Sequence, residues 1–206
     1  MPKMKKITIA VLLLFTLNSW SQDDKKLWLQ GNKYSLGLSY FQKKQFNKAI
    51  EPLLFAYKIN SESEIGKKSK NIIDSLKPIV RTNFINKIIG TWSLNGNEPT
   101  WVRKDLKAPK DYDSLMVISN QEIAYYVKNI KTKETKLIKT DKIEFYEGFE
   151  NDYSVTEIIN PDNELWMYIV DESSNSLHLI QTGTITSSGR KRIDIDNKEA
   201  YYSRIK

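Results

Sequence analysis

The stretch Ile88-Ile89-Gly90-Thr91-Trp92-Ser93-Leu94 marks a change in the pattern of the chain. Before Gly90, apolar residues recur at the three- and four-residue spacing of an amphipathic helix. After it they alternate with a period of two, as in a strand. The change predicts an α+β protein, with a helical region over residues 22–89 packed on a C-terminal antiparallel sheet over residues 90–206.

The segment after Gly90 contains short strand patterns separated by turn-forming residues. The predicted strands cover 91–95, 100–103, 114–119, 123–129, 135–145, 153–160, 164–171, 176–182 and 200–205. The polar residues 184–198 predict a loop or hairpin. Short connections make consecutive strands antiparallel neighbours. We therefore expect an up-and-down β-barrel, because closing the sheet removes its exposed edges.

Two short motifs in this segment resemble the lipocalin family. Gly90-Thr91-Trp92 is similar to the Gly-x-Trp at the start of the first lipocalin strand, and Tyr201-Tyr202-Ser203-Arg204-Ile205 resembles the Tyr-rich last strand of secreted bacterial lipocalin-like domains. The resemblance extends over residues 88–206. It implies that Trp92 plugs one end of a barrel and that Arg204 stacks over it, a cation–π contact of about 1 kcal/mol beyond burial.

The segment before Gly90 predicts paired helices. Apolar residues at helical spacing run from Leu27 to Tyr57, interrupted at Lys43-Lys44-Gln45. This predicts two antiparallel helices that approach closely at the small residues Gly37 and Ala49. The motifs Leu36-Gly37-x-x-Tyr40, Phe46-x-x-Ala49 and Leu53-x-x-Ala56 are similar to one tetratricopeptide repeat. An ordinary amphipathic hairpin needs much the same residues.

A lone repeat cannot bury its own apolar face, so the next segment is expected to cover it. Ser61 or Ser63 is a candidate helix cap, and an apolar stripe follows from Ile65 to Ile89. Pro78 is expected to end one helix and begin another, because proline lacks the N–H donor and clashes with the preceding turn.

Composition excludes several kinds of site. The 206 residues include no Cys and a single His, which excludes Cys-ligated metals, thiol catalysis and zinc sites built on several His. Residues 22–89 carry a net charge of +7 and residues 90–206 a net charge of −3. The lysines of the helical region are scattered and accompany no nucleic-acid motif, so we expect a solvated basic face and no nucleic-acid partner.

Residues 1–21 have the features of a secretory signal peptide. Three lysines precede an apolar stretch over residues 7–17, and Ser19-Trp20-Ser21 offers a cleavage site. The apolar stretch is shorter than the roughly 20 residues of a membrane span, although an uncleaved anchor is the alternative. We expect export, to the periplasm or outside the cell, with no stable membrane anchor after cleavage.

Catalytic and metal-binding patterns are weak. Glu144, Glu147, Glu150 and Asp152 form a cluster that could serve acid–base chemistry or bind calcium, but their place at a strand end and turn favours ordinary solvated residues. The segment 194–199 resembles a calcium loop but lacks its glycine, and predicts a turn. His178 alternates with Leu177 and Leu179, so it should face away from them. We expect no enzyme, no metal and no cofactor.

Two functions follow. In the first, the barrel binds a small, mostly apolar molecule, with Trp101, Tyr126, Trp166 and Tyr168 as the candidate contacts. In the second, the helical hairpin binds a peptide or protein partner and the barrel serves as a rigid scaffold.

Overall fold

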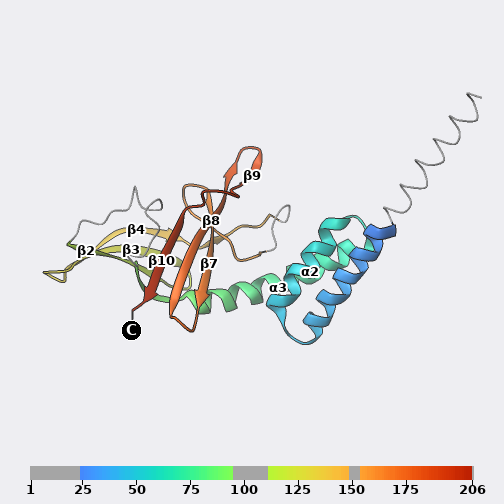
Figure 1. Cartoon of the computed structure of the whole chain (residues 1–206), viewed down its shortest axis with the longest axis horizontal. Coiled ribbons are helices and arrows are strands. Elements are labelled where there is room, and N and C mark those ends of the chain that lie inside the picture. The colour runs from blue at the N-terminus through green and yellow to red at the C-terminus, as the bar shows by residue number, and fades with distance from the viewer. Residues whose placement is uncertain (1–23, 95–110, 149–153, 206) are drawn as a thin grey trace, which may run out of the picture. The chain divides into compact units, whose positions relative to one another are not determined.

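The computed structural model describes residues 24–94, 111–148 and 154–205 (Figure 1). The chain forms two compact units. Among the described residues, one unit contains residues 24–79, and the other contains residues 80–94, 111–147 and 155–205. The predicted signal peptide lies outside the described residues.

The helical unit contains a first helix over residues 24–42, then α2 (Phe46–Ile59) and the beginning of α3 (Glu64–Ile88) (Figure 1). The predicted pair of helices and the turn near residue 45 are confirmed. Gly37 allows the predicted close approach, since a Cβ atom there would lie 2.6 Å from Leu53 Cγ. Ala49 and Leu53 are fully buried and form the centre of this unit.

The third helix differs from the prediction at Pro78. Ser63 caps its start as predicted, because Ser63 Oγ accepts a hydrogen bond from Gly66 N at 3.0 Å. The expected break at Pro78 is wrong, because α3 is one helix of 25 residues with Pro78 inside it. Leu76 and Val80 are both buried, at 1% and 5% exposure. Packing on either side of Pro78 thus offsets the cost of about 3 kcal/mol for proline inside a helix.

In the second unit, the described residues after α3 form an antiparallel sheet of ten strands (Figure 1). The strands are β1 (Gly90–Leu94), β2 (Tyr112–Ile118), β3 (Glu122–Asn129), β4 (Thr135–Lys142), β5 (Glu144–Phe145), β6 (Ile158–Ile159), β7 (Glu164–Asp171), β8 (Ser176–Thr186), β9 (Gly189–Arg192) and β10 (Glu199–Arg204). Their order is β4-β3-β2-β1-β10-β8-β7-β6-β5, and β9 pairs with β8. The hairpin predicted within residues 184–198 is therefore present, whereas the predicted strand 100–103 lies outside the described residues.

The predicted closed barrel is wrong, because β4 and β5 form the two ends of the order and no ladder joins them. Ile143 alone separates these strands along the chain, so the polypeptide connects the two ends while hydrogen bonds do not.

The ladder between β5 and β6 is short, because the predicted strand 153–160 is reduced to the two residues of β6. The carbonyl oxygens of Val155 and Tyr146 instead accept hydrogen bonds from the Arg81 guanidinium, at 2.8 and 3.1 Å. In a longer ladder, these carbonyl oxygens would accept hydrogen bonds from a neighbouring strand. Here they accept them from the side chain of Arg81 in α3.

One face of the sheet, here called the inner face, packs against the last turns of α3. The core on this face is a cluster that includes Ile85 and Ile88 of α3 and the fully buried Trp92, Met116 and Leu177 of the sheet. The first and last strands of the sheet in sequence, β1 and β10, pair with each other, and Trp92 of β1 lies opposite Arg204 of β10.

Candidate ligand-binding site

The four predicted ligand contacts do not share one site. Trp166 and Tyr168 lie on the inner face, where Trp166 packs against the core cluster and Tyr168 belongs to it. Tyr126 lies on the opposite face, because it follows Tyr125, which packs against the same cluster. Trp101 lies outside the described residues. The structure therefore brings together two of the four predicted contacts.

Tyr125 is a central residue of this face that the sequence did not single out. Its phenol oxygen accepts a hydrogen bond from Tyr168, and Tyr202 and Asp141 lie near the two phenols. Burial is the main cause that raises the pKa of Tyr125 to about 12 and the pKa of Tyr168 well above its ordinary value. Both phenols are therefore neutral at physiological pH and can donate or accept hydrogen bonds.

A charged pair extends this group toward the surface. The Asp141 side chain is 8% exposed and the Lys139 side chain 48% exposed, and their ion pair measures 2.7 Å. Lys139 Nζ lies 4.8 Å from the centre of the Tyr125 ring. We call Tyr125, Asp141, Tyr168 and Lys139 the phenol cluster. It places a few polar groups beside the buried apolar core of the inner face, with Lys139 reaching solvent at the terminal strand β4.

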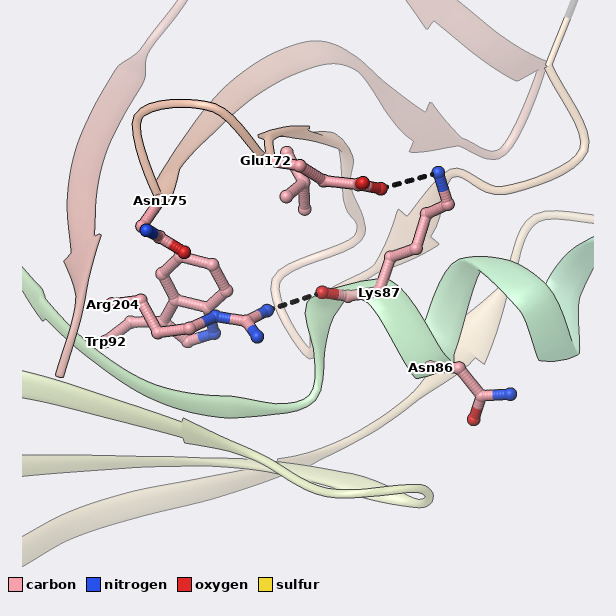
Figure 2. Close-up of a pocket in the computed structure, with 7 residues that line it drawn as sticks. Asn86, Lys87, Trp92, Glu172, Asn175 and Arg204 are labelled. Atoms are coloured by element: carbon pink, nitrogen blue, oxygen red, sulfur yellow. Dashed lines mark hydrogen bonds and ion pairs between the residues drawn. The ribbon is translucent and has the colours of Figure 1, made fainter. Parts of the chain in front are cut away.

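The contact between Arg204 and Trp92 expected from the lipocalin resemblance is present (Figure 2). Arg204 Cζ lies 4.5 Å from the Trp92 ring centre. Arg204 Nη2 donates to Lys87 O at 2.6 Å, and Trp92 Nε1 donates to Ile88 O at 2.8 Å. Both donors thereby satisfy carbonyls at the C-terminal end of α3, which have no partner within the helix.

The other two motif residues serve the same junction. Gly90 adopts a φ of 143°, a conformation that side chains rarely take. Thr91 O accepts a hydrogen bond from Ile205 N at 2.8 Å, next to the β1–β10 ladder. The motif therefore joins α3, β1 and β10, which is a structural role.

A pocket of about 310 Å³ opens beside this junction (Figure 2). Its lining residues are Asn86, Lys87, Trp92, Val170, Glu172, Asn175 and Arg204. The charged groups already have partners, since Lys87 pairs with Glu172 at 2.9 Å and Arg204 binds the helix end. This junction therefore caps the C-terminal end of α3, and the phenol cluster is the remaining candidate site.

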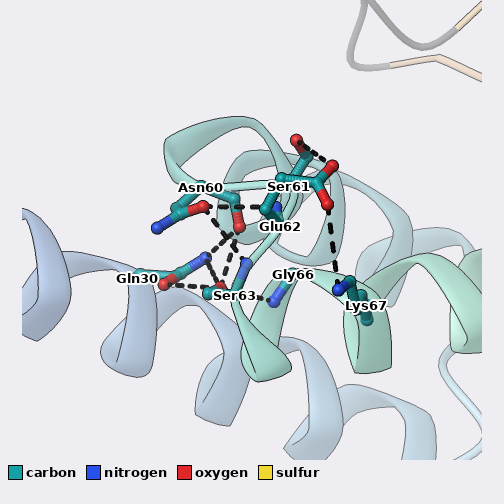
Figure 3. A network of polar contacts seen from close by, with 7 residues as sticks. All are labelled: Gln30, Asn60, Ser61, Glu62, Ser63, Gly66 and Lys67. Carbon is teal, nitrogen blue, oxygen red and sulfur yellow. Dashed lines mark hydrogen bonds and ion pairs between the residues drawn. The ribbon is translucent and has the colours of Figure 1, made fainter.

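A second pocket, of about 380 Å³, lies in the helical unit and is lined by Lys26, Leu27, Gln30, Ile59 and Asn60. Gln30 is fully buried, and its amide nitrogen donates to Ala56 O at 2.8 Å. The same nitrogen donates to Asn60 O at 2.9 Å and to Ser63 Oγ at 2.8 Å (Figure 3). This network ties the first helix to the turn between α2 and α3. The predicted partner-binding role of the helices stays a prediction.

The remaining candidate residues have structural partners. Glu147 pairs with Arg81, while Glu150 and Asp152 lie outside the described residues. In the calcium-like segment, the Asn197 side chain donates to Gln181 O and Ile193 O, so this segment is a turn, as predicted.

His178 faces away from the core, as predicted, with its side chain 26% exposed. Its Nε2 lies 2.8 Å from a Glu199 oxygen, and its ring stacks on Tyr201 at 4.2 Å. The hydrogen bond from the Tyr201 hydroxyl to Glu199 raises the pKa of Tyr201 to about 12 and lowers that of Glu199.

Within the described parts of the chain, no group of three or more His, Asp or Glu side chains is placed to hold a metal ion. None of the described helices combines the length and the apolar composition that a membrane crossing requires.

Comparisons of the chain with protein-family models, with curated proteins and with solved structures find no match. The described residues define the class: an α+β protein, with three helices and a large antiparallel sheet in this part of the chain.

Proposed function

We propose that this is an exported, non-enzymatic binding protein that holds a small, mostly apolar molecule against the inner face of its sheet. The observation that carries the proposal is the phenol cluster. Binding sites for small molecules are mostly apolar and contain a few convergent polar groups, often with perturbed pKa values. Tyr125, Tyr168 and Asp141 supply such groups, and Trp166 supplies an aromatic surface beside them.

The expected ligand has an apolar body and one polar end. Because Asp141 is paired with Lys139, the cluster is close to neutral and presents phenol hydroxyls. A hydroxyl or carbonyl group of the ligand would exchange hydrogen bonds with these phenols. The Arg204–Trp92 contact supports a lipocalin-like origin for the sheet unit, in which the sheet is open between β4 and β5.

The test uses the full chain and three single variants that each remove one hydroxyl. Native mass spectrometry detects a co-purifying small molecule, and the fluorescence of anilinonaphthalene sulfonate measures binding to apolar surface. We expect Tyr125→Phe and Tyr168→Phe to weaken binding about twofold to tenfold, the effect of one lost hydrogen bond.

Tyr126→Phe is the matched control, because it removes the same group from the opposite face of β3 and should leave binding unchanged. Circular dichroism verifies that all three variants are folded. A wild-type protein that purifies without a small molecule and does not bind the probe would contradict the proposal. Equal losses in Tyr125→Phe and Tyr126→Phe would contradict the assigned site.

A further inference from the structure

The terminal strand β4 has an open edge. It pairs with β3, and no strand among the described residues occupies its other side. All of its eight residues except Asp141 are exposed, and the exposed fractions of Leu137 and Ile138 are 50% and 56%. An edge of this length with exposed apolar side chains is a template for pairing with another strand.

The ladder shows which backbone groups face this edge. The hydrogen bond from Ser119 N to Glu122 O directs the backbone of Glu122 toward β2, and alternation along the strand directs Ala124 the same way. Thr140 lies opposite Ala124. The N–H and C=O groups of Thr140 therefore face away from β3, toward the open edge.

The charge around this edge selects the partner. Residues 128–142 contain six lysines and two acids, a net charge of +4. Lys136 and Lys142 of β4 are exposed. Pairing with β4 of a second copy would bring two lysine-rich strands together, and like charges opposite each other destabilise a ladder. The same lysines attract a strand that carries carboxylates.

We propose that the open edge of β4 binds an extended, acidic segment of a partner protein as an additional strand. The backbone groups of Thr140 and Lys142, which face the open edge by the same alternation, supply main-chain hydrogen bonds, and the lysines supply charge selectivity. Leu137 and Ile138 offer apolar contacts to side chains of the added strand, which is the usual division of labour in this mode of recognition.

The test measures fluorescence anisotropy of a labelled peptide as long as β4, with alternating Glu and Val, against the full-length protein. We expect this peptide to bind and a Lys–Val peptide of the same length to bind at least about tenfold more weakly, with affinity falling as salt is added. Thr140→Pro removes the N–H that faces the edge and spares the β3–β4 ladder. It should weaken binding about tenfold or more.

Thr140→Val is the matched control, since it keeps the N–H and the branched side chain. Circular dichroism verifies folding of both variants. If Thr140→Pro does not fold, Lys136→Glu with Lys142→Glu takes its place and should reverse the preference toward the Lys–Val peptide. Failure of the Glu–Val peptide to bind, equal binding to Thr140→Pro and Thr140→Val, or no change on charge reversal would each overturn the proposal.

Discussion

Among single residues, Tyr125 links the stability of the sheet unit to pH. Its pKa in the folded protein, about 12, lies above the ordinary value of 10.0, so the fold favours the neutral phenol. This contribution is fully present below pH 10 and is lost as the pH rises toward 12, because the unfolded chain loses its proton first. The difference between the two pKa values corresponds to at most about 3 kcal/mol.

We therefore expect the free energy of unfolding to fall between pH 10 and 12, and to fall less steeply in Tyr125→Phe. Urea unfolding followed by tryptophan fluorescence at neutral pH and at about pH 11 measures the change. Tyr168 shifts in the same direction, so part of the dependence should remain in this variant. A dependence that is identical in Tyr125→Phe and the wild type would contradict the assignment.

The positions of single residues were predictable where those residues belong to a short sequence motif. Gly90, Trp92 and Arg204 come from motifs at the two ends of the sheet segment, and their contact follows from the pairing of β1 with β10. The sequence could not show whether Tyr125 or Tyr126 faces the inner side. Apolar residues lie on both faces of β3, so only the register with β2 and the packing of α3 decide. The burial of Asp141 was not predicted, because the residues next to it in the sequence, Thr140 and Lys142, are polar.

For helices and strands, the first helix and α2 approach each other closely at Gly37. A Cβ atom at Gly37 would meet Leu53 Cγ at 2.6 Å, whereas one at Gly31 in the same helix would meet nothing within 4 Å. We expect Gly37→Ala to destabilise the helical unit by about 1–3 kcal/mol, because a core with no free space must shift. Gly31→Ala should stabilise it by up to about 1 kcal/mol, because alanine is the better helix former.

Urea unfolding followed by circular dichroism at helical wavelengths compares the two variants. They share one substitution and one helix, so a difference in helix propensity cannot explain opposite effects. A stabilising Gly37→Ala would show that the two helices separate without cost at this position.

Most elements follow from periodicity, and the exceptions have physical causes. The helical pair and most strands have the predicted type because their apolar spacing is strong. The break expected at Pro78 is absent because buried residues flank it, which local sequence rules do not include. The sheet does not close between β4 and β5, because the single residue Ile143 that separates them is too short for the turn of a hairpin.

For the whole molecule, the division into units follows packing and differs from the change of periodicity. The sequence changes pattern at Gly90, but the last turns of α3 belong with the sheet, and the boundary lies between Ile79 and Val80. An apolar stripe along a helix shows that one face is buried and does not show which partner buries it. Pro78 lies next to this boundary. The sequence therefore indicated where the units divide, but it wrongly predicted that the helix breaks there.

Two units with separate cores should unfold in two steps. Leu53 in the helical unit and Leu177 in the sheet unit are both fully buried, so the same substitution can be made in each core. We expect Leu53→Ala and Leu177→Ala each to lower the stability of its own unit by about 2–5 kcal/mol. Leu53→Ala should move the transition seen by circular dichroism of the helices, and Leu177→Ala the transition seen by the fluorescence of Trp92 and Trp166. Because α3 contributes to both cores, a single transition that shifts equally in both variants would show that this helix couples the units into one cooperative structure.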